Sequence, residues 1–221
     1  MTQSEAGQRD VYVIANVSAD VKSDLDGVTN LTGLQGVLES KSEPWSGMGA
    51  TNLKHPILMS GMKNHNFVTQ GRVLSSVELI RAFAKVELNV TLPTKHQSTN
   101  VADYKYNFVD FDKNTYVLEK TNKTANTAAT GWKPFVSNID TDKDHVSEYT
   151  KTGDVVTSLK IVTYINETTN ANSYIEIQLP YKDGGFLPPP EFGPETFILP
   201  RQGKIERNHW YKYDVDLGDT E

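Results

Sequence analysis

The sequence predicts a mainly β protein, and three observations lead to that prediction. Apolar and polar residues alternate over much of the chain, which is the pattern of strands with one buried face. The 221 residues include 22 Thr and 16 Asn, and Thr favours strands whereas Asn favours the turns between them. Little of the chain has a helical pattern and several strands are separated by long polar loops, which favours a β-sandwich over a closed barrel.

The first expected strand is the continuous apolar run 11–15, which suits a strand buried on both faces. From 18 to 39, apolar residues recur at spacings of three and four, which predicts one or two short helices. Three glycines interrupt this stretch, and each destabilises a helix by about 1 kcal/mol relative to alanine. Two short helices therefore fit better than one long helix. Residues 43–54 are expected to form a loop, and 57–59 a short strand that enters a turn at 60–61.

The segment 73–92 carries the strongest pattern in the chain. Seven apolar residues hold every second position: Ile80, Ala82, Ala84, Val86, Leu88, Val90 and Leu92. The preceding apolar residues Val73, Val77 and Leu79 have the opposite parity. A change of parity reverses the inward face, which requires a bulge or a passage from one core to another. We therefore expect a domain boundary here, with domains at 1–80 and 81–221.

The rest of the chain predicts further strands and loops. The strands are expected at 104–108, 116–118, 155–165, 174–179 and 210–217. Asp112 to Asn114 has the composition of a hairpin turn between the first two. The tract 121–130 is expected to be an exposed loop, and the proline-rich 184–200 a stiff loop that cannot donate to a sheet ladder. In the last strand, four apolar or aromatic residues alternate with Trp210 and three charged ones, which predicts a half-buried strand.

Composition excludes several classes of function. The net charge is −6 and there are no basic runs, so nucleic acid is not an expected partner. The longest apolar run has five residues, 11–15, far below the roughly 18 to 20 that a membrane-spanning helix needs. The chain contains no cysteine, which removes disulfides, thiol nucleophiles and zinc fingers and leaves the cellular compartment open.

No metal, cofactor or catalytic residue is predicted. Asp140, Asp142 and Asp144 resemble the start of a calcium loop, but His145 replaces the glycine and Lys151 the bidentate glutamate that the loop needs. A solvated acidic loop is the simpler interpretation. The histidines form no zinc-binding pair, and there is no serine nucleophile elbow or glycine-rich phosphate loop.

Four fragments in order resemble the fimbrillin superfamily of Bacteroidales type V pili, which includes shaft, anchor and tip subunits. They are Val11-Tyr12-Val13-Ile14-Ala15-Asn16, Ile57-Leu58-Met59-Ser60-Gly61, Arg81-Ala82-Phe83-Ala84-Lys85-Val86-Glu87-Leu88 and Ile205-Glu206-Arg207-Asn208-His209-Trp210-Tyr211. Each motif is weak alone, but together they span most of the chain. The third motif in the family crosses from the N-terminal into the C-terminal domain, where the parity changes here.

The resemblance implies two transthyretin-like β-sandwich domains, of which the N-terminal one is incomplete because only ten residues precede Val11. It further implies a non-enzymatic structural subunit of a cell-surface fimbria attached to the outer membrane. Such subunits polymerise by donor-strand exchange after a protease has cut behind an arginine, and they support adhesion. The expected partners are other fimbrial subunits, with host or bacterial surface glycans or proteins left open as ligands.

The resemblance also selects candidate residues. Val11, Val13, Val77 and Leu79 are expected to line the donor-strand groove, and Arg9 is a candidate processing site. Because the chain ends directly after the closing strand, it is expected to be a fragment or a subunit completed by another chain.

Two other functions remain open. One is a carbohydrate-binding β-sandwich module with a stacking platform built from Trp45 or Trp132. The other is an accessory domain of a hydrolase. By its place in an alternating strand, Trp210 is expected to be a core or interface residue.

Overall fold

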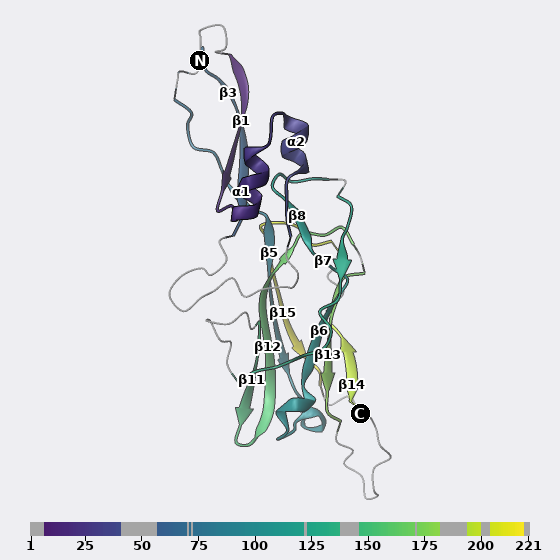
Figure 1. Ribbon diagram of the computed structural model, residues 1–221. Helices are drawn as coiled ribbons and strands as arrows, with labels where there is room; N and C mark the ends of the chain where they lie inside the picture. The colour runs from purple at the N-terminus through teal and green to yellow at the C-terminus, as the bar shows by residue number, and fades with distance from the viewer. Residues whose placement is uncertain are drawn as a thin grey trace, which may run out of the picture.

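The computed structural model describes residues 7–40, 57–69, 71, 73–121, 123–137, 146–170, 172–181, 194–199 and 204–218. Figure 1 shows an elongated molecule, with the antiparallel strands β1 and β3 and two helices at one end of a sandwich of two sheets. The mainly β fold class is therefore confirmed. The strands are β1 (Gln8–Ala15), β2 (Leu38–Ser40), β3 (Met59–Asn66), β4 (Ile80–Arg81), β5 (Phe83–Thr91), β6 (Lys105–Val109), β7 (Phe111–Asp112), β8 (Asn114–Tyr116), β9 (Thr127–Ala128), β10 (Lys133–Pro134), β11 (Ser147–Thr152), β12 (Val155–Asn166), β13 (Tyr174–Leu179), β14 (Glu195–Ile198) and β15 (Trp210–Asp216).

The two α-helices lie where the sequence predicts them, as α1 (Ala19–Asp26) and α2 (Leu31–Gly36). Each begins at a polar cap. The side chains of Ser18 and Asn30 accept hydrogen bonds from the amides three residues later, at 3.3 and 2.8 Å. Gly27 ends α1 and separates the pair, as the glycine pattern indicates. Single 3₁₀ turns also occur at Thr94–His96 and Val101–Asp103.

The N-terminal sheet has the order β1, β3, β4. The β1 and β3 strands pair antiparallel along their whole length, whereas β4 pairs only with Met59 and Ser60. No residue of β1 is buried. The prediction that the run 11–15 is buried on both faces is therefore wrong for the described chain, because β1 is an edge strand with β3 as its one strand partner in this sheet.

The C-terminal part is a sandwich of two four-stranded sheets, ordered β11-β12-β5-β15 and β10-β6-β13-β14. All pairs are antiparallel except β15 with β5, which is parallel. The large core lies between the sheets. The strict alternation predicted for β5 is confirmed, because its even-numbered side chains Ala84, Val86, Leu88 and Val90 are at most 2% exposed and lie in this core.

A smaller core joins the helices to the sandwich. Its buried members are Val21, Val37, Ile57, Leu58, Ala82, Phe83 and Val117. The chain bends at Ala82, between β4 and β5, and side chains pass from the small core to the large one between Phe83 and Ala84. This passage lies four residues after the change of parity between Leu79 and Ile80. The boundary between 1–80 and 81–221 itself stays a prediction, and β2 crosses it by pairing with β8.

The turn predicted at Ser60 and Gly61 is wrong, because both residues lie inside β3. Gly61 is needed for a different reason. A Cβ atom there would come within 1.9 Å of the Glu78 carbonyl oxygen and 3.1 Å of a Val77 methyl group. The glycine therefore allows the segment that leads into β4 to cross closely over β3.

Other expected elements differ in their pairing. The hairpin between 104–108 and 116–118 does not form, since β6 pairs with β10 and β13, and β8 pairs with β2. The tract 121–130 is only partly a loop, because β9 lies within it and pairs with β7. The proline-rich 184–200 contains β14, which pairs with β13. Residues 73–79 belong to no strand.

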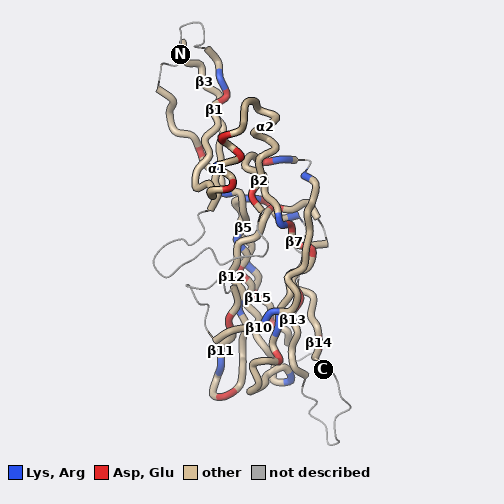
Figure 2. The backbone as a smooth tube through the Cα atoms, in the orientation of Figure 1, with Lys and Arg blue, Asp and Glu red and all other residues tan. Residues whose placement is uncertain are grey.

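Charges of both signs are interspersed along the chain, as Figure 2 shows, and they form no long basic run. Among the described residues, no helix is long and apolar enough to cross a membrane.

Candidate functional site

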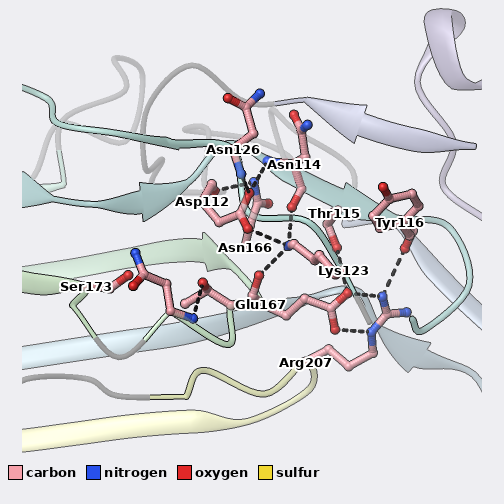
Figure 3. Close-up of polar contacts among 12 residues, drawn as sticks. Asp112, Asn114, Thr115, Tyr116, Lys123, Asn126, Asn166, Glu167, Ser173 and Arg207 are labelled. Atoms are coloured by element: carbon pink, nitrogen blue, oxygen red, sulfur yellow. Dashed lines mark hydrogen bonds and ion pairs between the residues drawn. The ribbon is translucent and has the colours of Figure 1, made fainter. Parts of the chain in front are cut away.

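Four charged side chains are buried together where the sandwich meets the N-terminal part of the molecule (Figure 3). Asp112 belongs to β7, Lys123 to the segment after β8, Glu167 follows β12, and Arg207 precedes β15. All four residues are at most 9% exposed. Burying a charge destabilises the fold unless the charge is paired and hydrogen-bonded. The contacts among these four groups therefore decide whether the cluster stabilises the protein.

Glu167 and Arg207 form a bidentate ion pair. The Arg207 Nε donates to the Glu167 Oε2 at 2.7 Å, and Nη2 donates to Oε1. Nη2 also donates to the Tyr116 carbonyl oxygen at 3.0 Å, at the end of β8. The pair therefore holds the ends of β8 and β12 against the turn that begins β15, through the parallel donors that an arginine offers.

Lys123 is held in the same cluster by three oxygen atoms. Its Nζ lies 3.2 Å from the Asp112 Oδ2 and donates to the backbone carbonyls of Asn114 and Glu167. Burial lowers the pKa of Lys123, and the nearby Asp112 carboxylate opposes that shift. With two hydrogen bonds to backbone carbonyls and a carboxylate beside it, the ammonium group is arranged to join segments.

Two of the sequence motifs meet beside this cluster. Asn208 has a left-handed backbone with a φ of 61°, and its N–H donates to the Phe83 carbonyl oxygen at 2.9 Å. Its side-chain oxygen accepts a hydrogen bond from the Arg81 Nη1 at 3.3 Å. Asn tolerates this backbone better than most residues. The motifs around Arg81 and Asn208 are thus one structural unit that sets β15 parallel to β5.

The predicted groove residues lie on or near one face of the N-terminal sheet. Val11 and Val13 pair with Lys63 and Gly61 of β3, and Val77 lies over Gly61 on the same side. Val11, Val13, Val77 and Leu79 are all half-buried. Their assignment to a donor-strand groove stays a prediction.

Arg9, the candidate processing site, lies inside β1 and pairs with His65. Its side chain is exposed, and its Nη1 donates to the Gln8 carbonyl oxygen at 3.1 Å. A protease needs an extended segment that is not part of a sheet, so cleavage here requires β1 to detach from β3. Its role also stays a prediction.

A cavity of about 400 Å³ opens on the other face of the same sheet. Tyr12 and Met62 are cross-strand partners on that face, and Ile80 and Leu118 complete its apolar wall. Met62 is 55% exposed. The sequence alone did not select these residues as part of a site. The signal was the position of Tyr12 between Val11 and Val13, because neighbouring side chains in a strand point to opposite faces of the sheet.

Comparison with known proteins shows the family. The model of the family described as minor fimbrium tip subunit MfA4, C-terminal, matches residues 82–216. A curated relative, the minor fimbrium tip subunit MfA4 of Porphyromonas gingivalis, is 43% identical over 235 residues, covering 98% of this chain and 69% of the relative. The chain belongs to the MfA4 family of fimbrial subunits.

Among solved structures, a candidate cell adhesion protein from Bacteroides eggerthii has a TM-score of 0.56 at 17% sequence identity. The match covers 95% of this chain and 68% of that one, and it shows a shared fold. The MfA4 family match begins at Ala82, the residue at which the chain bends into β5, and it ends with β15. The resemblance to fimbrillins read from four motifs is thus confirmed.

The remaining candidate residues in this member of the MfA4 family are the acidic segment 140–144 and the tryptophans. The acidic loop 140–144 and Trp45 lie outside the described residues. Within the described ranges, no group of three His, Asp or Glu side chains could hold a metal ion. Trp132 is 41% exposed and Trp210 is 61% exposed. Trp210 is therefore not a core residue, and the alternative that it is an interface residue stays a prediction.

Proposed function

We propose that this chain is a non-enzymatic tip subunit whose N-terminal sheet is completed by a strand from another fimbrial subunit. The chain is a fimbrillin-type structural subunit of cell-surface fimbriae, as its family shows. The proposal adds the manner of assembly by donor-strand exchange and a role in adhesion.

One observation carries the proposal, namely the incomplete N-terminal sheet. In the described residues, β3 has a partner on both sides only at Met59 and Ser60, where β4 pairs with it. From Gly61 to Asn66 it pairs only with β1. The cavity lined by Tyr12 and Met62 also borders Ile80, the first residue of β4. An incoming strand can thus pair with the open edge of β3 and place alternate side chains in the cavity.

The physical gain from such a strand is large. Each apolar side chain that it buries contributes about 1.5–3 kcal/mol, and each new backbone hydrogen bond adds about 1 kcal/mol net. An unpaired sheet edge also invites unwanted pairing, so completing the sheet removes a source of aggregation. Met62 is 55% exposed in the isolated chain, which fits a side chain that is buried only when another subunit binds.

Incorporation of variants into fimbriae tests the proposal. Met62→Asp places a carboxylate in the cavity wall, where burial by an incoming strand would cost several kcal/mol. We expect at least about tenfold less of this variant in sheared fimbriae than of the wild type, measured by immunoblot. Val73→Asp is the matched control, because Val73 is 82% exposed and does not line the cavity. Equal incorporation of folded Met62→Asp would refute the proposed binding of a strand at this cavity.

A further inference from the structure

A second cavity, of about 220 Å³, lies on the outer face of the sheet β11-β12-β5-β15. Three strands supply its floor in one lateral row. Tyr164 of β12 and Trp210 of β15 are both register partners of Lys85 in β5, so the two rings flank the lysine on one face. The walls come from Arg81, Asn208 and His209. The pocket is separate from the cavity at Tyr12 and Met62.

The charge of this pocket is opposite to that of the whole chain. Three cationic or protonatable side chains line it, Arg81, Lys85 and His209, although the chain carries a net charge of −6. Two carboxylates stand nearby, Glu87 at 3.8 Å from Lys85 and Glu206 at 3.6 Å from His209. Neither carboxylate lines the cavity, so the lining itself favours an anionic group.

The aromatic and basic groups are held in position before any ligand arrives. The Lys85 Nζ lies 4.4 Å from the centroid of the Trp210 ring, a cation–π contact. The Arg81 guanidinium is fixed by the Asn208 side-chain oxygen at 3.3 Å. Trp210 is nevertheless 61% exposed. A large aromatic ring on the solvent side of a sheet stabilises the core little, and it offers an apolar surface with a polar edge to a ligand.

We infer that this pocket binds a sugar unit that carries a carboxylate, such as a sialic acid or a uronic acid. The C–H face of the sugar ring would pack against Trp210 and Tyr164, and the carboxylate would pair with Arg81 and Lys85. At about 220 Å³ the cavity is smaller than the roughly 300 Å³ of sites for drug-sized ligands, which suits a single ring.

An extended acidic peptide fits this pocket less well. A peptide that adds to a sheet gains affinity from backbone hydrogen bonds along an open edge. The floor here is the face of three hydrogen-bonded strands, β12, β5 and β15, and a sheet face offers no such ladder. The inference gives the adhesive part of the proposed function a ligand class and rests on that part alone, not on donor-strand exchange.

Calorimetric titration of the purified chain tests the inference with three oligosaccharides: 3′-sialyllactose, a hyaluronan tetrasaccharide and lactose. We expect one or both acidic probes to bind and lactose to bind at least about tenfold more weakly, because it lacks the carboxylate. The two acidic probes distinguish a sialic acid from a glucuronic acid. Equal affinity for lactose, or no binding of either acidic probe, would overturn the inference.

Variants place the binding in the pocket. Trp210→Ala and Lys85→Gln are each expected to weaken binding of the acidic probe about tenfold or more. Trp132→Ala, which removes an exposed tryptophan that does not line the pocket, should leave the affinity unchanged. A Trp210→Ala variant that folds and binds normally contradicts the inference, as does a hexaglutamate peptide that binds better than both sugars.

The same variants separate this inference from the proposed assembly. Met62→Asp should bind the acidic sugar normally, because Met62 lies at the other cavity. Trp210→Ala should enter fimbriae normally, because it leaves the N-terminal sheet unchanged. Loss of sugar binding with normal assembly, or the reverse, thus identifies which site has failed.

Discussion

Among single residues, Arg207 is the one whose loss should cost most, since it pairs with a buried carboxylate. Arg207→Met leaves Glu167, 8% exposed, without its cation, and removing one partner of a buried pair costs about 3–5 kcal/mol. Urea unfolding measures the loss. The double variant Glu167→Gln with Arg207→Met should lose less than the single variant, because no uncompensated charge remains. A single variant within about 1 kcal/mol of the wild type would contradict this account.

Tyr104 should make stability depend on pH in the alkaline range. Its fully buried hydroxyl donates to the His96 carbonyl oxygen at 2.8 Å and accepts from the Ser98 N–H at 2.6 Å. Burial raises the pKa of Tyr104 from 10.0 to about 12. The folded chain therefore keeps a proton that the unfolded chain has lost. Stability that is complete below pH 10 thus falls as the pH rises to 12, by about 3 kcal/mol at most.

The variant Tyr104→Phe isolates this effect. At pH 8 it should be less stable than the wild type by about 1–3 kcal/mol, because two buried polar groups lose their partner. Between pH 10.5 and 12 the difference should shrink. Lys123 acts in the opposite sense, since its lowered pKa makes stability rise with pH up to 10.5, so the comparison is best made above that value. Parallel stability curves for the two proteins, recorded by chemical unfolding, would disprove the assignment.

Among elements, those with a local signal could be predicted from the sequence. The alternation in β5 and β15 and the spacing in α1 and α2 each depend on residues close together in the chain. Partners depend on distant residues, which is why β8 was expected to pair with β6 and instead pairs with β2. The parallel pairing of β15 with β5 has no local signal either.

The sequence alone also leaves the structural role of glycine and charged residues within an element ambiguous. Gly61 has the composition of a turn, yet it serves a close crossing inside β3, because both situations require a missing Cβ. Glu167 and Lys123 look like surface residues in the sequence, because polarity alone does not reveal a buried partner. The motif containing Arg207 can be recognised in the sequence. Its structural role is clear only from the structure, in which Arg207 donates hydrogen bonds to Glu167 and to the Tyr116 carbonyl oxygen.

Across the whole molecule, burial is uneven along its length. Residues of β5 and β12 fill the large core, whereas β1 has no buried residue and β3 has only Ser60 and His65. The small core around Leu58 and Phe83 connects the two parts. Few buried apolar contacts make local opening easy. The antiparallel strands β1 and β3 should thus be the least protected pair of long strands in the isolated subunit.

Hydrogen exchange of the isolated chain and of assembled fimbriae checks this expectation together with the proposed assembly. In the isolated chain, amides of β1 and β3 should exchange faster than those of β5 and β12, since their hydrogen bonds open without loss of the large core. In fimbriae, a strand bound at the incomplete sheet should slow exchange in β1 and β3 and leave β5 and β12 as they were. If β1 and β3 are already as protected as β5 in the isolated chain, the N-terminal sheet needs no partner and the donor-strand proposal fails.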